Sequence, residues 1–220
     1  MKNINKIWSA SLIIALILTG STGYTENTSR KCSAGFRLGG AVEEEHILDD
    51  IITLSCFARC PLTENIAVEM SLDSSTFEVE SPPELIGLPD NTAAEIEDTS
   101  GKASVFTFAV EYTFGKQNAL FIPYLRAGCG IGFEDIEDFL VSENDNNYLI
   151  EIEADDHAKI VPTLSSGIRI APRKCRWQFD MECRYDYHAI NWEVTGINAN
   201  ENRLSSHQTF GIFLGISANI

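Results

Sequence analysis

The stretch KCRWQFDMECRYDYH, residues 174–188, alternates between apolar and polar side chains without interruption. One parity is apolar and contains Trp177, Phe179 and Met181, whereas the other parity contains only charged or polar residues. Such strict alternation predicts a long β-strand with one face in an apolar medium and the other face in a polar one. A soluble sandwich would turn the apolar face inward, whereas an outer-membrane barrel turns it toward lipid and keeps a polar lumen.

Seven further segments repeat this alternation and cover residues 34–41, 52–59, 66–73, 106–114, 121–133, 160–170 and 209–220. Short turns follow the second, fourth and sixth of the eight segments, whereas the connections 43–50, 75–101, 135–157 and 190–205 are long. An even number of strands, with short turns on one side and long loops on the other, is typical of bacterial outer-membrane proteins. The sequence therefore predicts an all-β fold, an eight-stranded antiparallel transmembrane (outer-membrane) β-barrel with both chain ends on the periplasmic side.

The charge of the chain is strongly negative and unevenly distributed. Lys and Arg number 16 and Asp and Glu number 32, which gives a net charge of −16. This charge argues against a nucleic-acid partner, because phosphate backbones attract clusters of Lys and Arg. The four long connections contain 23 of the acidic residues and a single basic residue, Arg203. This acidic crown is either a solvated, repulsive surface or a collector of divalent cations, Ca²⁺ or Mg²⁺. No defined metal site and no cofactor is expected.

The N-terminus has the pattern of a secretory signal peptide. Lys2 and Lys6 precede or border the apolar run IWSASLIIALIL, residues 7–18, and small residues follow it. The run is too short for a comfortable membrane span. We expect a cleaved signal peptide over residues 1–23 and a barrel domain over residues 24–220. We expect a monomer in the cell outer membrane of a Gram-negative-type bacterium, in contact with outer-membrane lipid and lipopolysaccharide.

The cysteines leave one soluble alternative open. Six cysteines in an exported chain allow three disulfides among fifteen possible pairings. Their spacing matches no zinc signature, and four of them fall on apolar strand faces, where a cysteine behaves as a small hydrophobe. A complete disulfide framework would instead indicate a secreted, disulfide-bonded β-sandwich that serves as a binding module.

The inward parity of the predicted strands contains an equal number of acidic and basic side chains. Charges inside a small barrel must pair and form hydrogen bonds, because burying an isolated charge is costly. Eight strands leave an interior that side chains fill, which favours a salt-bridged plug over a gated pore. The predicted lumen network consists of Arg37, Arg59, Glu69, Asp73, Glu111, Arg126, Arg169, Arg176, Asp180, Glu182, Arg184 and Asp186.

Two stretches, PYLRAGCGIGF at residues 123–133 and TFGIFLGISANI at residues 209–220, resemble the small outer-membrane barrels of the OmpA/OmpX type. The segments PYLRAGCGIGFEDIED, RYDYHAIN and INANENRLSSH also resemble the lipid A deacylase (acyloxyacyl hydrolase) family. In that family a His-x-Ser-Asn segment supplies a base and a nucleophile, and the resemblance places the catalytic base at His188. The position of the nucleophilic Ser is occupied by Ile190.

These observations favour a non-catalytic outer-membrane barrel with a salt-bridged lumen, acidic surface loops and a structural or surface-interaction role. The alternative is a lipid A deacylase-like esterase of the outer membrane. That reaction would require a hydroxyl group within hydrogen-bond reach of His188.

Overall fold

The computed structural model describes residues 31–43, 48–79, 94–96, 99–115, 119–136, 139–143, 149–154, 158–172, 175–196 and 199–220. The predicted signal peptide, residues 1–23, lies outside the described residues. None of the described residues forms a helix that is long and apolar enough to cross a membrane.

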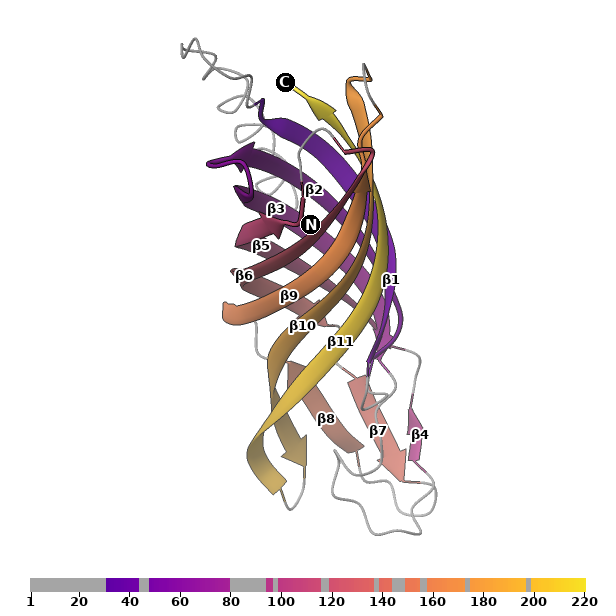
Figure 1. The fold of residues 1–220 in the computed structure, drawn as a ribbon. Coiled ribbons are helices and arrows are strands. Elements are labelled where there is room, and N and C mark those ends of the chain that lie inside the picture. Colours follow the sequence, from indigo (N-terminus) through magenta and orange to yellow (C-terminus); the bar gives the residue numbers. More distant parts are fainter. Residues whose placement is uncertain are drawn as a thin grey trace.

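Eight long antiparallel strands close into a barrel. They are β1 (Ser33–Glu43), β2 (Leu48–Pro61), β3 (Ile66–Val79), β5 (Thr99–Thr113), β6 (Phe121–Ile136), β9 (Lys159–Ile170), β10 (Trp177–Gly196) and β11 (Ala199–Asn219). Each strand pairs with its neighbour in this order, and β11 pairs with both β10 and β1. The strands wind around a common axis (Figure 1). The predicted fold class is confirmed, and the alternative of a β-sandwich is wrong.

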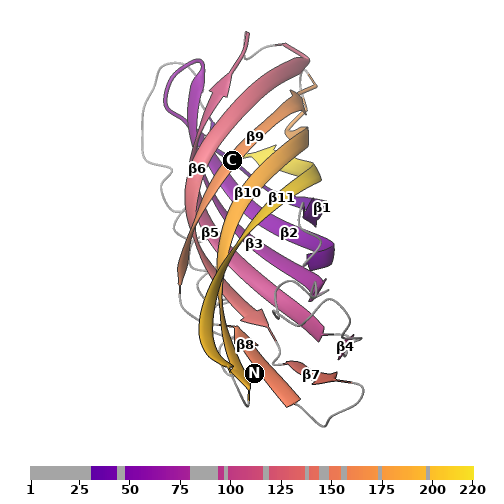
Figure 2. The same cartoon turned by 90° about the horizontal axis from the view of Figure 1, so that it is seen from below.

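The two ends of the barrel differ. One end, called the turn end below, contains the turn at residues 62–65, the described turn residues 114–115, 119–120, 171–172 and 175–176, and Lys31 and Ile220. The opposite end, called the extension end, contains three short strands, β4 (Ala94–Ile96), β7 (Phe139–Glu143) and β8 (Leu149–Ala154). β8 pairs with β10, β7 with β8 and β4 with β7, so the sheet continues beyond the barrel (Figures 1 and 2).

The connection predicted over residues 190–205 is for the most part a continued hairpin and not a loop. β10 and β11 pair without interruption from Trp177 and Ala218 to Gly196 and Ala199. The prediction of a long connection was wrong because it was based on hydropathy. The alternation of apolar and polar side chains ends where the strand leaves the apolar medium. The backbone hydrogen bonds between two paired strands can continue in water.

The side chains follow the predicted parity, with the apolar face outward. Phe36 is 58% exposed and its neighbour Arg37 only 1%. On β10, Trp177 and Met181 are 51% and 52% exposed, whereas Glu182 is 1% exposed. A water-soluble domain would bury the apolar residues and expose the charged ones. This barrel is arranged the other way round, as outer-membrane barrels are.

One disulfide joins the first two strands at the turn end. Cys32, directly before β1, is bonded to Cys60 near the end of β2, and their Cα atoms are 4.3 Å apart. Cys56, Cys129, Cys175 and Cys183 are free. The structure therefore has one disulfide and not the three of a complete framework.

Candidate functional site in the barrel lumen

A cluster of buried charges fills the middle of the barrel. Alternate residues of a strand point to opposite faces, so each strand with an apolar outer face contributes every second side chain to the lumen. The ten side chains that form this lumen network are all at most 6% exposed: Arg37, Arg59, Arg126, Arg169, Arg184, Glu69, Asp73, Glu111, Asp180 and Glu182. Five cations face five anions, so the network has no net charge.

Glu69 of β3 and Glu182 of β10 form the centre of the network. Arg37 donates to both carboxylate oxygens of Glu69 at 2.7 Å, and Arg126 donates to Glu69 Oε1 at 2.5 Å. Arg126 also donates to Glu182, so it links the two carboxylates across the lumen. The hydroxyl of Tyr124 donates to Glu182 Oε2 at 2.9 Å. Four strands on different sides of the barrel are thereby tied together.

Nearer the turn end, a second group of charges surrounds Arg169 of β9. Its Nη2 lies 2.8 Å from both oxygens of Glu111, and its Nε lies 3.0 Å from Asp180 Oδ1. Arg59 lies beside this pair, with Nη1 at 3.4 Å from Glu111 and 3.6 Å from Asp180. Arg169 is therefore tightly held, whereas Arg59 has only long contacts.

Toward the extension end, Arg184 donates to Asp73 Oδ2 at 2.8 Å and to Glu182 Oε1 at 3.1 Å. Its guanidinium carbon lies 4.3 Å from the centre of the Phe213 ring. The Arg37 guanidinium lies 3.7 Å above the ring of Phe57 in the same way. Buried aromatic rings thus cover the flat faces of two guanidinium groups and attract the cations.

Beyond this layer, at the mouth of the lumen on the side of the extension end, called the outer mouth below, further acidic side chains contact histidines and a lysine. Glu134 lies 3.4 Å from His188 Nδ1 and 3.3 Å from Lys159 Nζ. Glu43 contacts His207, and both side chains are fully buried. Sequence reasoning did not single out these ion pairs, because Glu43 and Glu134 fall at the ends of the alternating segments. The sequence does contain a signal for them, because both glutamates keep the inward parity of their strands beyond the last apolar residue.

Two of the predicted lumen residues lie outside the network. Arg176 precedes β10, is exposed, and donates from Nε to the backbone oxygen of Asn219. Arg176 is therefore not part of the network. The alternation of inward and outward side chains holds only within a strand, and Arg176 lies outside one. Asp186 is on the inner face but half-buried, beside the outer mouth.

His188, the predicted catalytic base, points into the lumen and pairs with Glu134. In the strand register it lies opposite His207, while Ala189 and Ile190 lie opposite Ser206 and Ser205. Ester hydrolysis at the lipid face would require a histidine side chain that points outward, whereas His188 lies on the inner face of β10.

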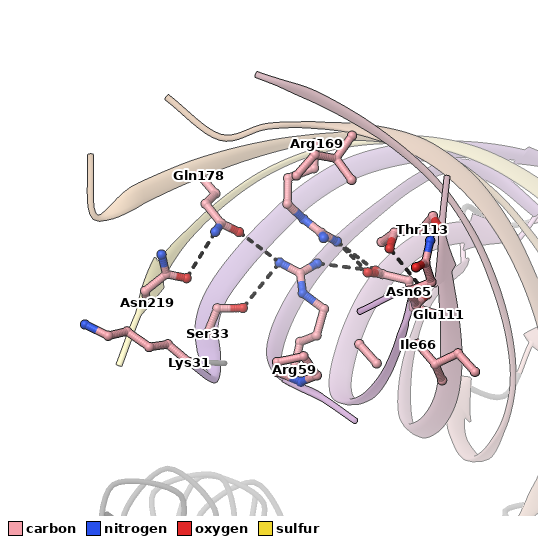
Figure 3. A pocket seen from close by; sticks show the side chains of 13 residues that line it. Lys31, Ser33, Arg59, Asn65, Ile66, Glu111, Thr113, Arg169, Gln178 and Asn219 are labelled. Carbon is pink, nitrogen blue, oxygen red and sulfur yellow. Dashed lines mark hydrogen bonds and ion pairs between the residues drawn. The ribbon is translucent and has the colours of Figure 1, made fainter. Parts of the chain in front are cut away.

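Two cavities lie on either side of the network. A cavity of about 300 Å³ opens at the turn end, and a small one of about 50 Å³ lies near the outer mouth. No residue lines both cavities, and the layer of Arg37, Glu69, Arg126 and Glu182 separates them. Figure 3 shows the larger cavity, with the Arg59 guanidinium between Ser33, Gln178 and Glu111.

Within the described ranges, no three His, Cys, Asp or Glu side chains gather so that they could hold a metal ion. Much of the acidic crown, including residues 80–93 and 144–148, lies outside the described residues. The expectation of divalent cations at the crown therefore stays a prediction.

The fold is similar to that of solved outer-membrane proteins. The outer membrane protein OprG from Pseudomonas aeruginosa is 13% identical, with a TM-score of 0.55, and the match covers 86% of this chain and 94% of OprG. A major outer membrane protein from Thermus thermophilus is 12% identical, with a TM-score of 0.50, and the match covers 86% and 99% of the two chains. At these identities the likeness shows the fold alone. No protein-family model and no curated protein matches the sequence.

Proposed function

We propose that this protein is a monomeric outer-membrane barrel with a closed lumen, that its turn end faces the periplasm, and that it acts as a structural or surface-interaction protein. The observation that carries the proposal is the combination of an apolar outer surface with a neutral, fully buried charge network. The proposal includes export by a cleaved signal peptide, residues 1–23.

The outer surface supports a location in lipid. Apolar side chains with more than a third of their surface exposed occur on all eight barrel strands, and Leu214 of β11 is 64% exposed. Soluble monomers rarely expose connected apolar patches of more than a few hundred Å². Aromatic residues lie near both rims, with Tyr112, Phe114, Phe121 and Trp177 toward the turn end. Aromatic girdles of this kind are typical of barrels at the two membrane interfaces.

The lumen supports a closed barrel rather than a channel. The salt bridges of Glu69 and Glu182 connect β1, β3, β6 and β10 and cross the space through which an ion would pass. A hydrated ion would have to separate buried ion pairs, and removing one partner of such a pair costs about 3–5 kcal/mol. We therefore expect no measurable conductance in a planar bilayer, in contrast to a porin.

The extension end supports the surface role. The strands β4, β7 and β8 and the end of the β10–β11 hairpin project beyond the barrel (Figure 1). The connections at this end are acidic, and the phosphate groups of lipopolysaccharide are also anionic. Divalent cations can bridge the two kinds of group, because Ca²⁺ and Mg²⁺ bind several carboxylate and phosphate oxygens. We propose lipopolysaccharide, bridged by such cations, as the partner of the extension end.

Membrane fractionation and gel migration test the location. A folded barrel fractionates with the outer membrane and migrates faster on a gel before boiling than after it. Release into detergent-free buffer with unchanged migration would refute the proposal.

Lipopolysaccharide binding to the protein in lipid nanodiscs tests the partner. Binding should require Ca²⁺ or Mg²⁺ and disappear on chelation. The competing hypothesis of ester hydrolysis predicts release of 3-hydroxy fatty acid from lipopolysaccharide, and loss of that release in the variant His188→Ala. Absence of release in the wild-type protein supports the non-catalytic role.

A further inference from the structure

The cavity at the turn end has a polar floor built from four strands. Arg59 of β2, Glu111 of β5, Arg169 of β9 and Gln178 of β10 face it, and Ser33 of β1 lies at its side. Its volume of about 300 Å³ would hold a small polar group together with water. The lumen network closes its inner end, so the cavity is a blind pocket open toward the turn end.

Arg59 lies near three carboxylates, with Nη1 at 3.8 Å from Glu69, 3.4 Å from Glu111 and 3.6 Å from Asp180, but none of its hydrogen bonds is short. Its hydrogen bonds to Ser33, Gln178 and Glu111 measure 3.3, 3.4 and 3.4 Å. Charge-assisted hydrogen bonds are normally about 2.7–2.9 Å long. Arg169 in the same cavity makes bonds of 2.8 Å to Glu111, so long contacts are not general here. The Arg59 guanidinium therefore has capacity to donate hydrogen bonds to a ligand.

Lys31 adds a second cation at the mouth of the cavity. It is exposed, and no acidic side chain of the described residues lies within ion-pair distance of it. The Cys32–Cys60 disulfide fixes the position of its segment beside Arg59, because Cys32 follows Lys31 and Cys60 follows Arg59. Two cations, Lys31 before β1 and Arg59 on β2, are thus held on one side of the same pocket.

Neutral donors complete the lining. Gln178 Nε2 donates to Asn219 Oδ1 at 3.0 Å, and Asn65 Nδ2 donates to the backbone oxygen of Thr113 at 2.8 Å. Each amide nitrogen has a second N–H, which these contacts do not use. The pocket thus combines free N–H donors with two cations, which suits an acceptor-rich ligand.

The charge of the described part of the turn end differs from that of the rest of the chain. Lys31 and the described residues of the turns, 62–65, 114–115, 119–120, 171–172 and 175–176, include two basic residues, Lys31 and Arg176, and one acidic residue, Glu64. The rest of the chain is so acidic that the net charge is −16. An anion is therefore repelled less strongly from the turn end than from the acidic crown.

We propose that the cavity at the turn end binds a phosphate-type oxyanion, either a free phosphate compound or the headgroup of an anionic phospholipid. Arg59 donates hydrogen bonds to the anion at the floor, Lys31 attracts it at the mouth, and the second N–H groups of Gln178 and Asn65 complete the contacts. This site goes beyond the proposed surface role, which concerns the opposite end of the barrel.

The site can be tested by chemical-shift titration of the ¹⁵N-labelled, folded protein in maltoside micelles, which contain no phosphate. The two probes are inorganic phosphate and dihexanoyl phosphatidylglycerol, with dihexanoylglycerol as the uncharged control. We expect saturable shifts of the Gln178 and Asn65 side-chain amides with at least one anionic probe and none with the control. Shifts with phosphate alone identify a free anion as the ligand, and tighter binding of phosphatidylglycerol identifies a lipid headgroup.

Variants assign the binding to this pocket. Lys31→Gln should weaken binding about two- to five-fold, the range of an exposed ion pair. Lys102→Gln, at an exposed lysine near the opposite end, should leave the affinity unchanged. Arg59→Gln should weaken binding at least about ten-fold, since it removes charge-assisted hydrogen bonds. Lys31→Gln keeps the test valid if Arg59→Gln does not fold.

Absence of saturable shifts with both probes in the folded wild-type protein would overturn the proposal, and so would equal affinities of the wild type and Lys31→Gln. Gel migration before and after boiling reports separately whether the barrel is folded, so a failure of this site is distinguishable from a failure of the outer-membrane proposal.

Discussion

Replacing Glu69 by Gln should destabilise the barrel strongly although the two side chains have nearly the same shape. Glu69 is 2% exposed and accepts three hydrogen bonds, two from Arg37 and one from Arg126. Gln offers one acceptor oxygen, and its amide group donates, so it faces guanidinium donors without bonding to them. The variant therefore loses about two charge-assisted bonds and leaves one positive charge unbalanced.

The magnitude follows from these contacts. A hydrogen bond to a charged group contributes about 1.5–3 kcal/mol net. Two lost bonds give about 3–6 kcal/mol, in line with the roughly 3–5 kcal/mol measured when one partner of a buried ion pair is removed. A typical domain is stable by about 5–15 kcal/mol, so this loss is a large fraction of the total.

The assay is urea unfolding of the protein in lipid vesicles, followed by tryptophan fluorescence. The matched control is Glu78→Gln, an exposed glutamate on the same strand, which should change the free energy of unfolding by less than about 0.5 kcal/mol. The double variant Glu69→Gln/Arg37→Gln should cost less than the sum of its single variants, because it restores the charge balance. If Glu69→Gln were as stable as Glu78→Gln, the interpretation of the network as a structural plug would be refuted.

Further variants test the two faces of the barrel and its disulfide. Gly39→Ala should cost about 1–3 kcal/mol, since its Cβ would lie 2.4 Å from Phe213 Cδ1, whereas Gly40→Ala should be tolerated, since the nearest atom is 3.6 Å away. Urea titration of both compares them directly. Leu214→Arg should lower the stability in lipid by about 2–4 kcal/mol because the site faces hydrocarbon; an unchanged unfolding midpoint would contradict this. Removing the disulfide, which closes a separation of 28 residues, with Cys32→Ser/Cys60→Ser should cost about 3–4 kcal/mol in the same assay.

The faces of the strands could be predicted from the sequence because their period is two and the two media differ in polarity. Arg37 and Phe36 are neighbours in the chain, and the parity of β1 places one inside and the other outside. The same rule places Arg126, Glu182 and Arg169 in the lumen. Fold class and most of the network follow from this one pattern.

Other features depend on information that alternation does not contain. The length of the β10–β11 hairpin is set by backbone pairing beyond the apolar band. The bond between Cys32 and Cys60 required the register of β1 and β2, since pattern alone allows fifteen pairings. The partners within the network, such as Arg126 with both Glu69 and Glu182, depend on which strands face one another across the lumen.

Nitroxide accessibility along the strands measures whether the apolar face of the barrel lies in lipid. In a protein whose four free cysteines are replaced by alanine, a nitroxide at Leu214→Cys, and another at Glu78→Cys as the aqueous reference, would be measured in lipid nanodiscs. The two relaxation agents are oxygen, which partitions into hydrocarbon, and a water-soluble nickel chelate. If the apolar face meets lipid, oxygen relaxes the label at 214 more than nickel does, and the order is reversed at 78. Greater access of nickel than of oxygen at 214 would contradict this orientation.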